Sequence, residues 1–358
     1  MAQLSLDIIR SVQKRYHSGM MKWHYEHGLV LFASLLAAEK YNDKSITDWV
    51  YSLYDPMIGE DGSIRTYRLG EYNLDQINAG RALFILGDKT GEERFLRAQD
   101  ILREQLRTQP RCLNGVYWHK EIYPWQIWLD GLYMEGPFNA EYGYRHGDEE
   151  EIDDVMNQLL TTYSVLKDGK TGLLYHAFDE SRGQRWSDEV TGCSPHFWSR
   201  SIGWYLMALI DVLDYVSEEN PKRGDLINII RALSSSLLPF QDGSGMWYQV
   251  PDLPEREGNY LETSATSMFA YSFYKGVRKG YLDPSYLVPA AKAVDGIKKL
   301  YLTKDGDEYH LGGICSVAGL GGNPYRDGSF KYYIKEKIAT DDFKGVGPFI
   351  LALLESEI

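Results

Sequence analysis

Apolar residues recur along most of this chain at spacings of three and four, which is the period of an amphipathic α-helix. Segments with the pattern of a strand are few and short, as in residues 172–176 and 245–249. The pattern therefore predicts an all-α protein. The predicted helices span residues 3–16, 26–41, 43–54, 73–87, 92–107, 126–146, 148–164, 196–217, 222–238, 262–279, 286–303 and 342–356.

The connections between these helices alternate in length. Short turns, such as those containing Asn42, Gly147 and Gly280, follow every second helix, whereas long loops such as 108–125 and 165–195 precede it. Because a short turn joins antiparallel neighbours, the helices should pair as hairpins, with all the long loops at one end. Six such hairpins fit a closed toroid, the (α/α)6 barrel, as a single catalytic domain over residues 1–358.

The distribution of apolar surface predicts which helices lie inside the toroid. Helix 196–217 is apolar over most of its surface, as a buried helix should be, whereas helix 92–107 has one charged face, as an outer helix should. The even-numbered helices should therefore form the inner ring. Their N-termini should converge on one mouth beside the long loops, where loops on a rigid scaffold commonly carry function.

Composition narrows the classes of partner. The chain has 358 residues, of which 44% are apolar, and a net charge of −13, which argues against nucleic acid or an anionic membrane as partner. No stretch is long and apolar enough to span a bilayer. Residues 2–10 are amphipathic and do not resemble a secretory signal, so we expect a cytoplasmic location.

The cysteines do not indicate a metal site. Cys112, Cys193 and Cys315 are widely separated, and neither their odd number nor their spacing fits a disulfide framework or a zinc site. No other cluster of His, Asp or Glu has convincing ligand spacing. We therefore expect no metal and no cofactor.

Asp130 is the first candidate for chemistry. It lies at the entry to helix 126–146, close to Trp125 and Trp128, in a chain with 27 Tyr and 9 Trp. Poor solvation among aromatic rings favours the acid form of a carboxylate, which suits a general acid, and aromatic rings suit a sugar. The same position also suits an aspartate that caps a helix beside core aromatics, so this segment alone leaves both interpretations open.

A second carboxylate, Asp75, lies near the start of helix 73–87. Asp75 and Asp130 can therefore face each other across the mouth, where mutual repulsion would help to keep one of them protonated. Lys344 lies at the start of the last inner helix and is a further candidate for substrate binding.

Three more residues are predicted to bind a ligand at this mouth. His119 and His176 lie beside aromatic residues in long loops that reach the same face. Arg200 lies on an apolar inner helix, where an unpaired charge is costly, so it should meet an Asp or hold a substrate carboxylate.

Several motifs, in one order along nearly the whole chain, resemble those of glycoside hydrolase family 105, the unsaturated rhamnogalacturonyl hydrolases. These motifs are residues 74–81, 128–134, 194–204, 319–322, 325–329 and 344–348. The family fold is the (α/α)6 barrel, in agreement with the predicted hairpins. The family often has Pro where this chain has Ala79, a position that we expect to be structural.

The resemblance implies a reaction and a set of site residues. The substrate would be a pectin-derived oligosaccharide that ends in a 4,5-unsaturated uronic acid, which is released by hydration of the vinyl ether. The residue matching Asp130 protonates C4 and activates the water that adds at C5, and the residue matching Asp75 binds ring hydroxyls. The remaining matches to active-site positions are His119, His176, Arg200 and Trp204, with Trp128 in the sugar-binding wall.

Three alternatives remain open from the sequence. The related family 88 hydrolases use the same chemistry on unsaturated glucuronyl units from glycosaminoglycans, although residues 319–322 and 325–329 favour rhamnogalacturonan. A sugar epimerase on the same barrel would use histidine pairs. A helical scaffold or sugar-binding protein would bind without turnover, which a carboxylate pair among aromatics argues against.

Overall fold

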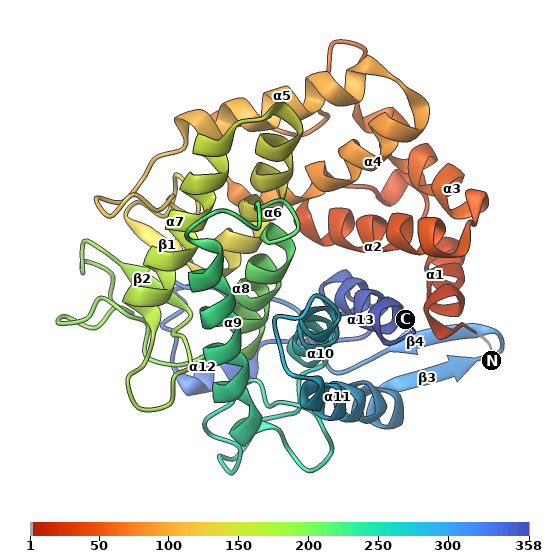
Figure 1. The fold of residues 1–358 in the computed structure, drawn as a ribbon. Helices are drawn as coiled ribbons and strands as arrows, with labels where there is room; N and C mark the ends of the chain where they lie inside the picture. Colours follow the sequence, from red (N-terminus) through yellow and green to blue (C-terminus); the bar gives the residue numbers. More distant parts are fainter. Residues whose placement is uncertain (1–2, 358) are drawn as a thin grey trace.

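The computed structural model describes residues 3–357, in which twelve long helices alternate between an outer and an inner ring (Figure 1). The outer helices are α1 (Leu4–Arg15), α3 (Lys44–Tyr54), α5 (Glu93–Thr108), α7 (Glu149–Leu166), α9 (Arg223–Leu237) and α11 (Leu287–Leu300). The inner helices are α2 (Tyr25–Tyr41), α4 (Arg81–Thr90), α6 (Leu129–His146), α8 (Ser199–Val212), α10 (Thr263–Arg278) and α13 (Phe343–Ser356).

The inner helices close into a ring. Neighbours pack against each other in order, α4 meets α6 through the 3-10 turn Asn78–Gly80, and α13 returns to α2. Every residue of α8 is buried, as the apolar pattern predicts for an inner helix. The predicted all-α (α/α)6 barrel is therefore confirmed.

Close packing at Ala79 shows why this position is structural. Ala79 is fully buried, and its carbonyl accepts a hydrogen bond of 2.8 Å from the Tyr54 hydroxyl. A Cβ atom on Gly28 of α2 would lie only 2.4 Å from the Ala79 Cα atom, so the two segments can approach only because residue 28 is glycine.

Three predicted elements differ from the structure. The predicted helix 73–87 begins with two 3-10 turns, Leu74–Gln76 and Asn78–Gly80, and becomes an α-helix only at Arg81. Asp75 therefore lies in a short turn that Asn73 caps by accepting a hydrogen bond from the Asp75 backbone amide. The predicted helix 196–217 is shorter, from Ser199 to Val212. The first three residues of the predicted helix 126–146 form a strand, so that helix begins only at Leu129.

The strands also differ from the prediction. Residues 172–176 and 245–249 contain only isolated bridges. The strands in the described residues form three small antiparallel pairs in the long loops and after α11. They are β1 (Gln126–Trp128) with β2 (Ala177–Asp179), β3 (Leu302–Asp305) with β4 (Glu308–Leu311), and β5 (Ile314–Cys315) with β6 (Ile338–Ala339). A short helix, α12 (Phe330–Lys335), completes the last loop.

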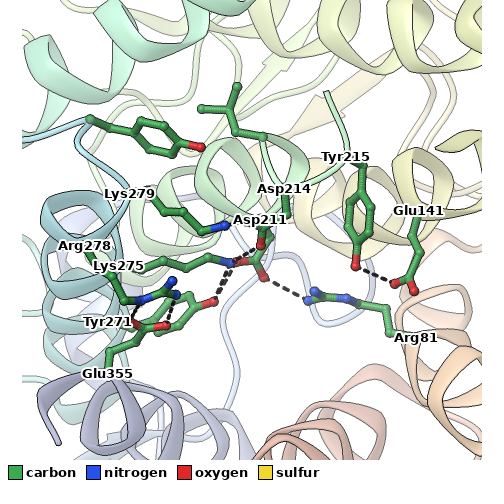
Figure 2. A network of polar contacts seen from close by, with 12 residues as sticks. Arg81, Glu141, Asp211, Asp214, Tyr215, Tyr271, Lys275, Arg278, Lys279 and Glu355 are labelled. Atoms are coloured by element: carbon green, nitrogen blue, oxygen red, sulfur yellow. Dashed lines mark hydrogen bonds and ion pairs between the residues drawn. The ribbon is translucent and has the colours of Figure 1, made fainter. Parts of the chain in front are cut away.

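A buried ionic network joins the inner helices away from the long loops, as Figure 2 shows. Asp211 of α8 is fully buried and accepts hydrogen bonds from Arg81 Nη1 of α4 at 3.0 Å and Lys275 Nζ of α10 at 2.7 Å. Arg81 Nη1 also donates to the Tyr133 hydroxyl of α6 at 2.9 Å. Burial alone would raise the pKa of Asp211, but the charges of Lys275 and Arg81 lower it to about 2.

Two further contacts extend the network to the remaining inner helices. Arg278 of α10 forms a bidentate pair with Glu355 of α13, with both distances at 2.6 Å. Lys40 of α2 donates to the Leu354 carbonyl of α13 at 2.5 Å. All six inner helices are thus joined by polar contacts at this end.

We predict that Asp211→Asn lowers the free energy of unfolding by about 3–5 kcal/mol, because it leaves the buried Arg81 without a counter-charge and leaves Lys275 paired with Asp214 alone. Denaturant unfolding monitored by circular dichroism measures this difference. The matched control is Asp307→Asn, which removes the carboxylate from an exposed pair with Lys14 at 2.8 Å and should leave stability unchanged. Equal effects of the two substitutions would contradict a central role for Asp211.

Candidate active site

The N-terminal ends of the inner helices lie beside the long loops, where charged side chains from several of them come together. Tyr25, the first residue of α2, lies close to charged groups from several of these ends. Burial raises the pKa of the Tyr25 phenol, the carboxylates of Asp75 and Asp130 raise it further, and Arg200 opposes them. The structure therefore brings together Asp75, Asp130 and Arg200, as the helix pattern predicts.

The small sheet of β1 and β2 positions Asp130 beside His176. Trp128, the last residue of β1, is extended and pairs with Ala177, and the Leu129 amide donates to the His176 carbonyl at 3.1 Å. Asp130 follows as the second residue of α6, with its Oδ2 atom 3.3 Å from His176 Nε2. The other ring nitrogen of His176, Nδ1, lies 2.8 Å from the Tyr333 hydroxyl.

Asp130 has few partners for a buried carboxylate. Its Oδ2 atom has no hydrogen-bond partner within residues 3–357, because the contact with His176 lacks hydrogen-bond geometry. In the same part of the chain no Lys or Arg lies within ion-pair distance of Asp130, and His176 is the only charge-bearing neighbour at that range. The Asp130 side chain is 14% exposed, so a ligand can reach the carboxylate from its exposed side.

Asp75 has the opposite environment. Its Oδ2 atom lies 2.5 Å from Lys120 Nζ and 3.9 Å from His24 Nε2, and its Oδ1 atom lies 3.5 Å from His119 Nε2. Burial by itself would raise the pKa of Asp75, but Lys120 and the two histidines hold it well below its usual range. Asp75 is therefore an ionised carboxylate.

Sequence analysis missed Lys120 and His24. Lys120 directly follows His119 in a long loop, and His24 directly precedes an inner helix, so both positions carried a signal. A lysine or a histidine at such a position indicates a site residue only when the structure shows that it lies opposite Asp75.

Trp128 stands in a stack of three rings. On one face lies His119, with ring centroids 4.8 Å apart and an interplanar angle of 11°, and on the other lies Tyr123, at 4.9 Å and 16°. Burial lowers the pKa of His119 to about 4, with Lys120 acting in the same direction and Asp75 opposing. His119 is therefore neutral near pH 7.

Arg200 is buried and does not meet an aspartate. Its Nη1 atom donates to the Cys315 carbonyl at 2.6 Å and to the Ser264 hydroxyl at 3.3 Å. The Ser264 hydroxyl in turn donates to Glu262, which caps α10. Of the two expectations for Arg200, pairing with an Asp is therefore not met, because a carbonyl and a hydroxyl take its place, and binding of a substrate carboxylate stays a prediction. Arg200 Nε and Nη2 make no hydrogen bond to any residue from 3 to 357, which leaves them available to a ligand.

Trp204 and Lys344 are two further predicted site residues, and their main contacts are with residues next to this group. Trp204 is buried behind Tyr25, with ring centroids 6.0 Å apart, and stacks on Tyr133 at 5.0 Å. Lys344 Nζ pairs with Glu26 at 2.7 Å and with Asp342 at 2.9 Å. Trp204 thus supports the ring of Tyr25, and the charge of Lys344 is already paired. Substrate binding by either residue stays a prediction.

Two features that residues 3–357 lack bear on the class of protein. These residues contain no group of three or more His, Cys, Asp or Glu side chains arranged to hold a metal ion. None of the helices in this range combines the length and the apolar character needed to cross a membrane.

Comparison with known proteins gives consistent matches. The family model described as Glycosyl Hydrolase Family 88 matches residues 6–358. A solved glycoside hydrolase from family 105 of C. acetobutylicum is 44% identical, with a TM-score of 0.97 and coverage of 99% of both chains. Protein Atu3128 of Agrobacterium fabrum is 38% identical over 227 residues, which cover 62% of this chain and 97% of that protein. The unsaturated rhamnogalacturonyl hydrolase YesR of Bacillus subtilis is 26% identical over 282 residues, covering 75% of this chain and 77% of that protein.

We predict that His119 stays neutral until the pH falls to about 4. Titration of the histidine ring signals by NMR measures this, with the His119→Gln spectrum giving the assignment. Because the folded pKa lies below the unfolded value, the unfolded chain binds this proton first, so stability is lost as the pH falls from about 6.5 to 4. A ring signal that titrates near 6.5 would contradict the burial of His119.

Proposed function

This chain belongs to glycoside hydrolase family 105 and to the wider group that the Glycosyl Hydrolase Family 88 model describes, and we propose that it acts on rhamnogalacturonan fragments. The family predicted from the sequence motifs is thereby confirmed, and the chain is a glycoside hydrolase. In the proposed reaction it releases the 4,5-unsaturated uronic acid from the non-reducing end of these oligosaccharides. Membership of a hydrolase family argues against the epimerase and scaffold alternatives.

The difference between the two carboxylates carries this proposal. Asp75 is ion-paired with Lys120 at 2.5 Å and held ionised, so it cannot deliver a proton but can accept hydrogen bonds from sugar hydroxyls. Asp130 has no cationic side chain of this kind beside it in the described residues and has an unpartnered oxygen. Asp130 is therefore the group that can both give and take a proton, and Asp75 orients the sugar.

The proposed reaction balances with one water molecule. Asp130 transfers its proton to C4 of the alkene, positive charge develops at C5, and water adds there while its proton returns to Asp130. The resulting hemiketal at C5 opens to a ketone, which leaves a hemiacetal at C1. That hemiacetal collapses to an aldehyde and expels the remaining sugar as an alcohol.

The surroundings of the pocket suit the charge of such a substrate. Converging helix N-termini favour a bound carboxylate, and Arg200 has two guanidinium nitrogens without hydrogen bonds to residues 3–357. Trp128 is 5% exposed and stacks on both His119 and Tyr123, so it would support a sugar-binding wall from behind, and the half-buried Tyr123 is the neighbour with exposed aromatic surface. The likeness to YesR, together with the motifs at 319–322 and 325–329, supports rhamnogalacturonan over glycosaminoglycan as the source.

We predict that Asp130→Asn lowers kcat by about 10²–10⁴-fold, because the amide keeps the shape of the side chain but cannot transfer the proton. Substrate affinity measured by calorimetry and the thermal midpoint should stay close to those of the unaltered chain. The control is Asp188→Asn, which alters an exposed loop aspartate and should leave kcat unchanged. An Asp130→Asn variant with near-normal kcat would remove Asp130 from the proposed role.

We predict that unsaturated disaccharides from lyase-treated rhamnogalacturonan lose their alkene ultraviolet absorbance as rhamnose is released, with deuterium at C4 when the solvent is deuterium oxide. The saturated analogue should be inert, because it offers no alkene to protonate. An ordinary glycosidase would instead cleave the analogue at a comparable rate, with solvent oxygen at C1. If the protein turned over only disaccharides derived from glycosaminoglycans, its substrate would be the unsaturated glucuronyl unit of the family 88 alternative.

A further inference from the structure

Residues 319–326 form a tight hairpin that precedes α12 and belongs to none of the groups assigned to the reaction. The Gly321 amide donates to the Arg326 carbonyl at 2.8 Å, and the Arg326 amide donates back to the Gly321 carbonyl at 3.0 Å. Leu320, at the bend, is fully buried in a small apolar cluster with Trp128, Ala177 and Trp186. The hairpin is therefore anchored directly against the aromatic wall of the pocket.

The hairpin folds around the guanidinium of Arg326. Arg326 Nε donates to the Gly321 carbonyl at 3.0 Å, and Nη2 donates to the Tyr123 hydroxyl at 3.0 Å. A Cβ atom on Gly319 would lie 2.7 Å from Arg326 Nη1, and one on Gly322 would lie 3.1 Å from Nη2. The glycines in this motif thus leave the space that the guanidinium occupies.

Tyr123 connects Arg326 to the pocket. Its ring stacks on Trp128, whose opposite face stacks on His119, and His119 Nε2 lies 3.5 Å from the carboxylate of Asp75. Parallel rings gain contact area but resist sideways sliding only weakly, whereas a hydrogen bond from a charged donor is directional. The hydrogen bond from Arg326 therefore holds Tyr123 in place over Trp128, and without it the Tyr123 ring could slide and leave one face of Trp128 uncovered.

We propose that Arg326 is a positioning residue for the sugar-binding wall, acting through the Tyr123 hydroxyl to keep the Tyr123 ring packed over Trp128, which in turn packs on His119 beside Asp75. This inference rests on the proposed function for its kinetic consequence only. The reacting atoms remain with Asp130, and Arg326 needs no contact with the substrate. The function of the motif at 319–326 is then to hold one arginine in place.

The test is a double-mutant cycle between Arg326→Ala and Tyr123→Phe. Tyr123→Phe removes only the oxygen that accepts the Arg326 hydrogen bond. Each variant should lower kcat/KM on the unsaturated disaccharide by about ten- to a hundredfold, as expected for a misplaced binding wall, and the double variant should lose no more than either alone. Independent, multiplying losses would overturn the proposal.

Two further variants separate positioning from a general loss of structure. Gly319→Ala keeps both polar partners but its methyl group displaces the end of the Arg326 side chain, so it should reproduce the kinetic loss. The matched control is Arg185→Ala, because Arg185 is an exposed arginine that lies over the Tyr325 ring at 4.1 Å, beside the same hairpin, without contacting the stack. Arg185→Ala should be near normal, and its small effect should multiply with that of Tyr123→Phe.

A spectroscopic readout keeps this inference distinguishable from the proposed reaction. Near-ultraviolet circular dichroism reports the fixed arrangement of Tyr123 and Trp128 without substrate. Arg326→Ala should alter the tryptophan part of this spectrum, and it should cause no further change in the Tyr123→Phe background, whether or not the disaccharide is turned over. Absence of turnover in the unaltered chain would contradict the proposed function alone. An unchanged band in Arg326→Ala, at an unchanged thermal midpoint, would overturn the positioning role.

Discussion

The buried carboxylate of Asp211 is the contact on which the arrangement of the inner helices depends. It takes counter-charge from Arg81 on α4 and Lys275 on α10, and Arg81 reaches Tyr133 on α6. A buried charge is tolerable only when it is paired and hydrogen-bonded, so these helices can pack in few relative positions. The opposite ends of the helices present polar groups beside the long loops, and among them Asp130 Oδ2 has no hydrogen-bond partner within residues 3–357.

The candidate active site is built from the polar groups at the N-terminal ends of the inner helices. Helix N-termini carry partial positive charge, and several of them meet there, so the site favours anions. Within it two aspartates have different surroundings. Asp75 is held ionised by Lys120, whereas Asp130 meets His176 and keeps an unpartnered oxygen. In the reaction that we propose, this asymmetry lets one carboxylate exchange a proton while the other holds the sugar.

The long loops give the pocket its rigid wall. The β1–β2 pair joins the loop before α6 to the loop before α8, and the hairpin at 319–326 packs its Leu320 against Trp128. Trp128 therefore has neighbours from three loops, each far from the others in sequence. A sugar-binding surface built on loops needs such cross-links, because binding contacts are useful only when the rings are held in place before the ligand arrives.

The sequence by itself determined the helices, the hairpin pairing and the closed toroid, because apolar periodicity and loop length are local properties that survive folding. It also identified Asp75, Asp130, His119, His176 and Arg200 as residues of one mouth, and the structure brings these residues together, although their roles stay predictions. Only the tertiary structure decided that residues 74–80 form 3-10 turns, that Lys120 forms an ion pair with Asp75, and that Arg200 donates to a carbonyl and a hydroxyl instead of an aspartate. Each of these three features depends on which residues pack against the segment from elsewhere in the barrel. Those residues lie tens to hundreds of positions away in the sequence, so no local pattern of apolar and polar residues predicts them.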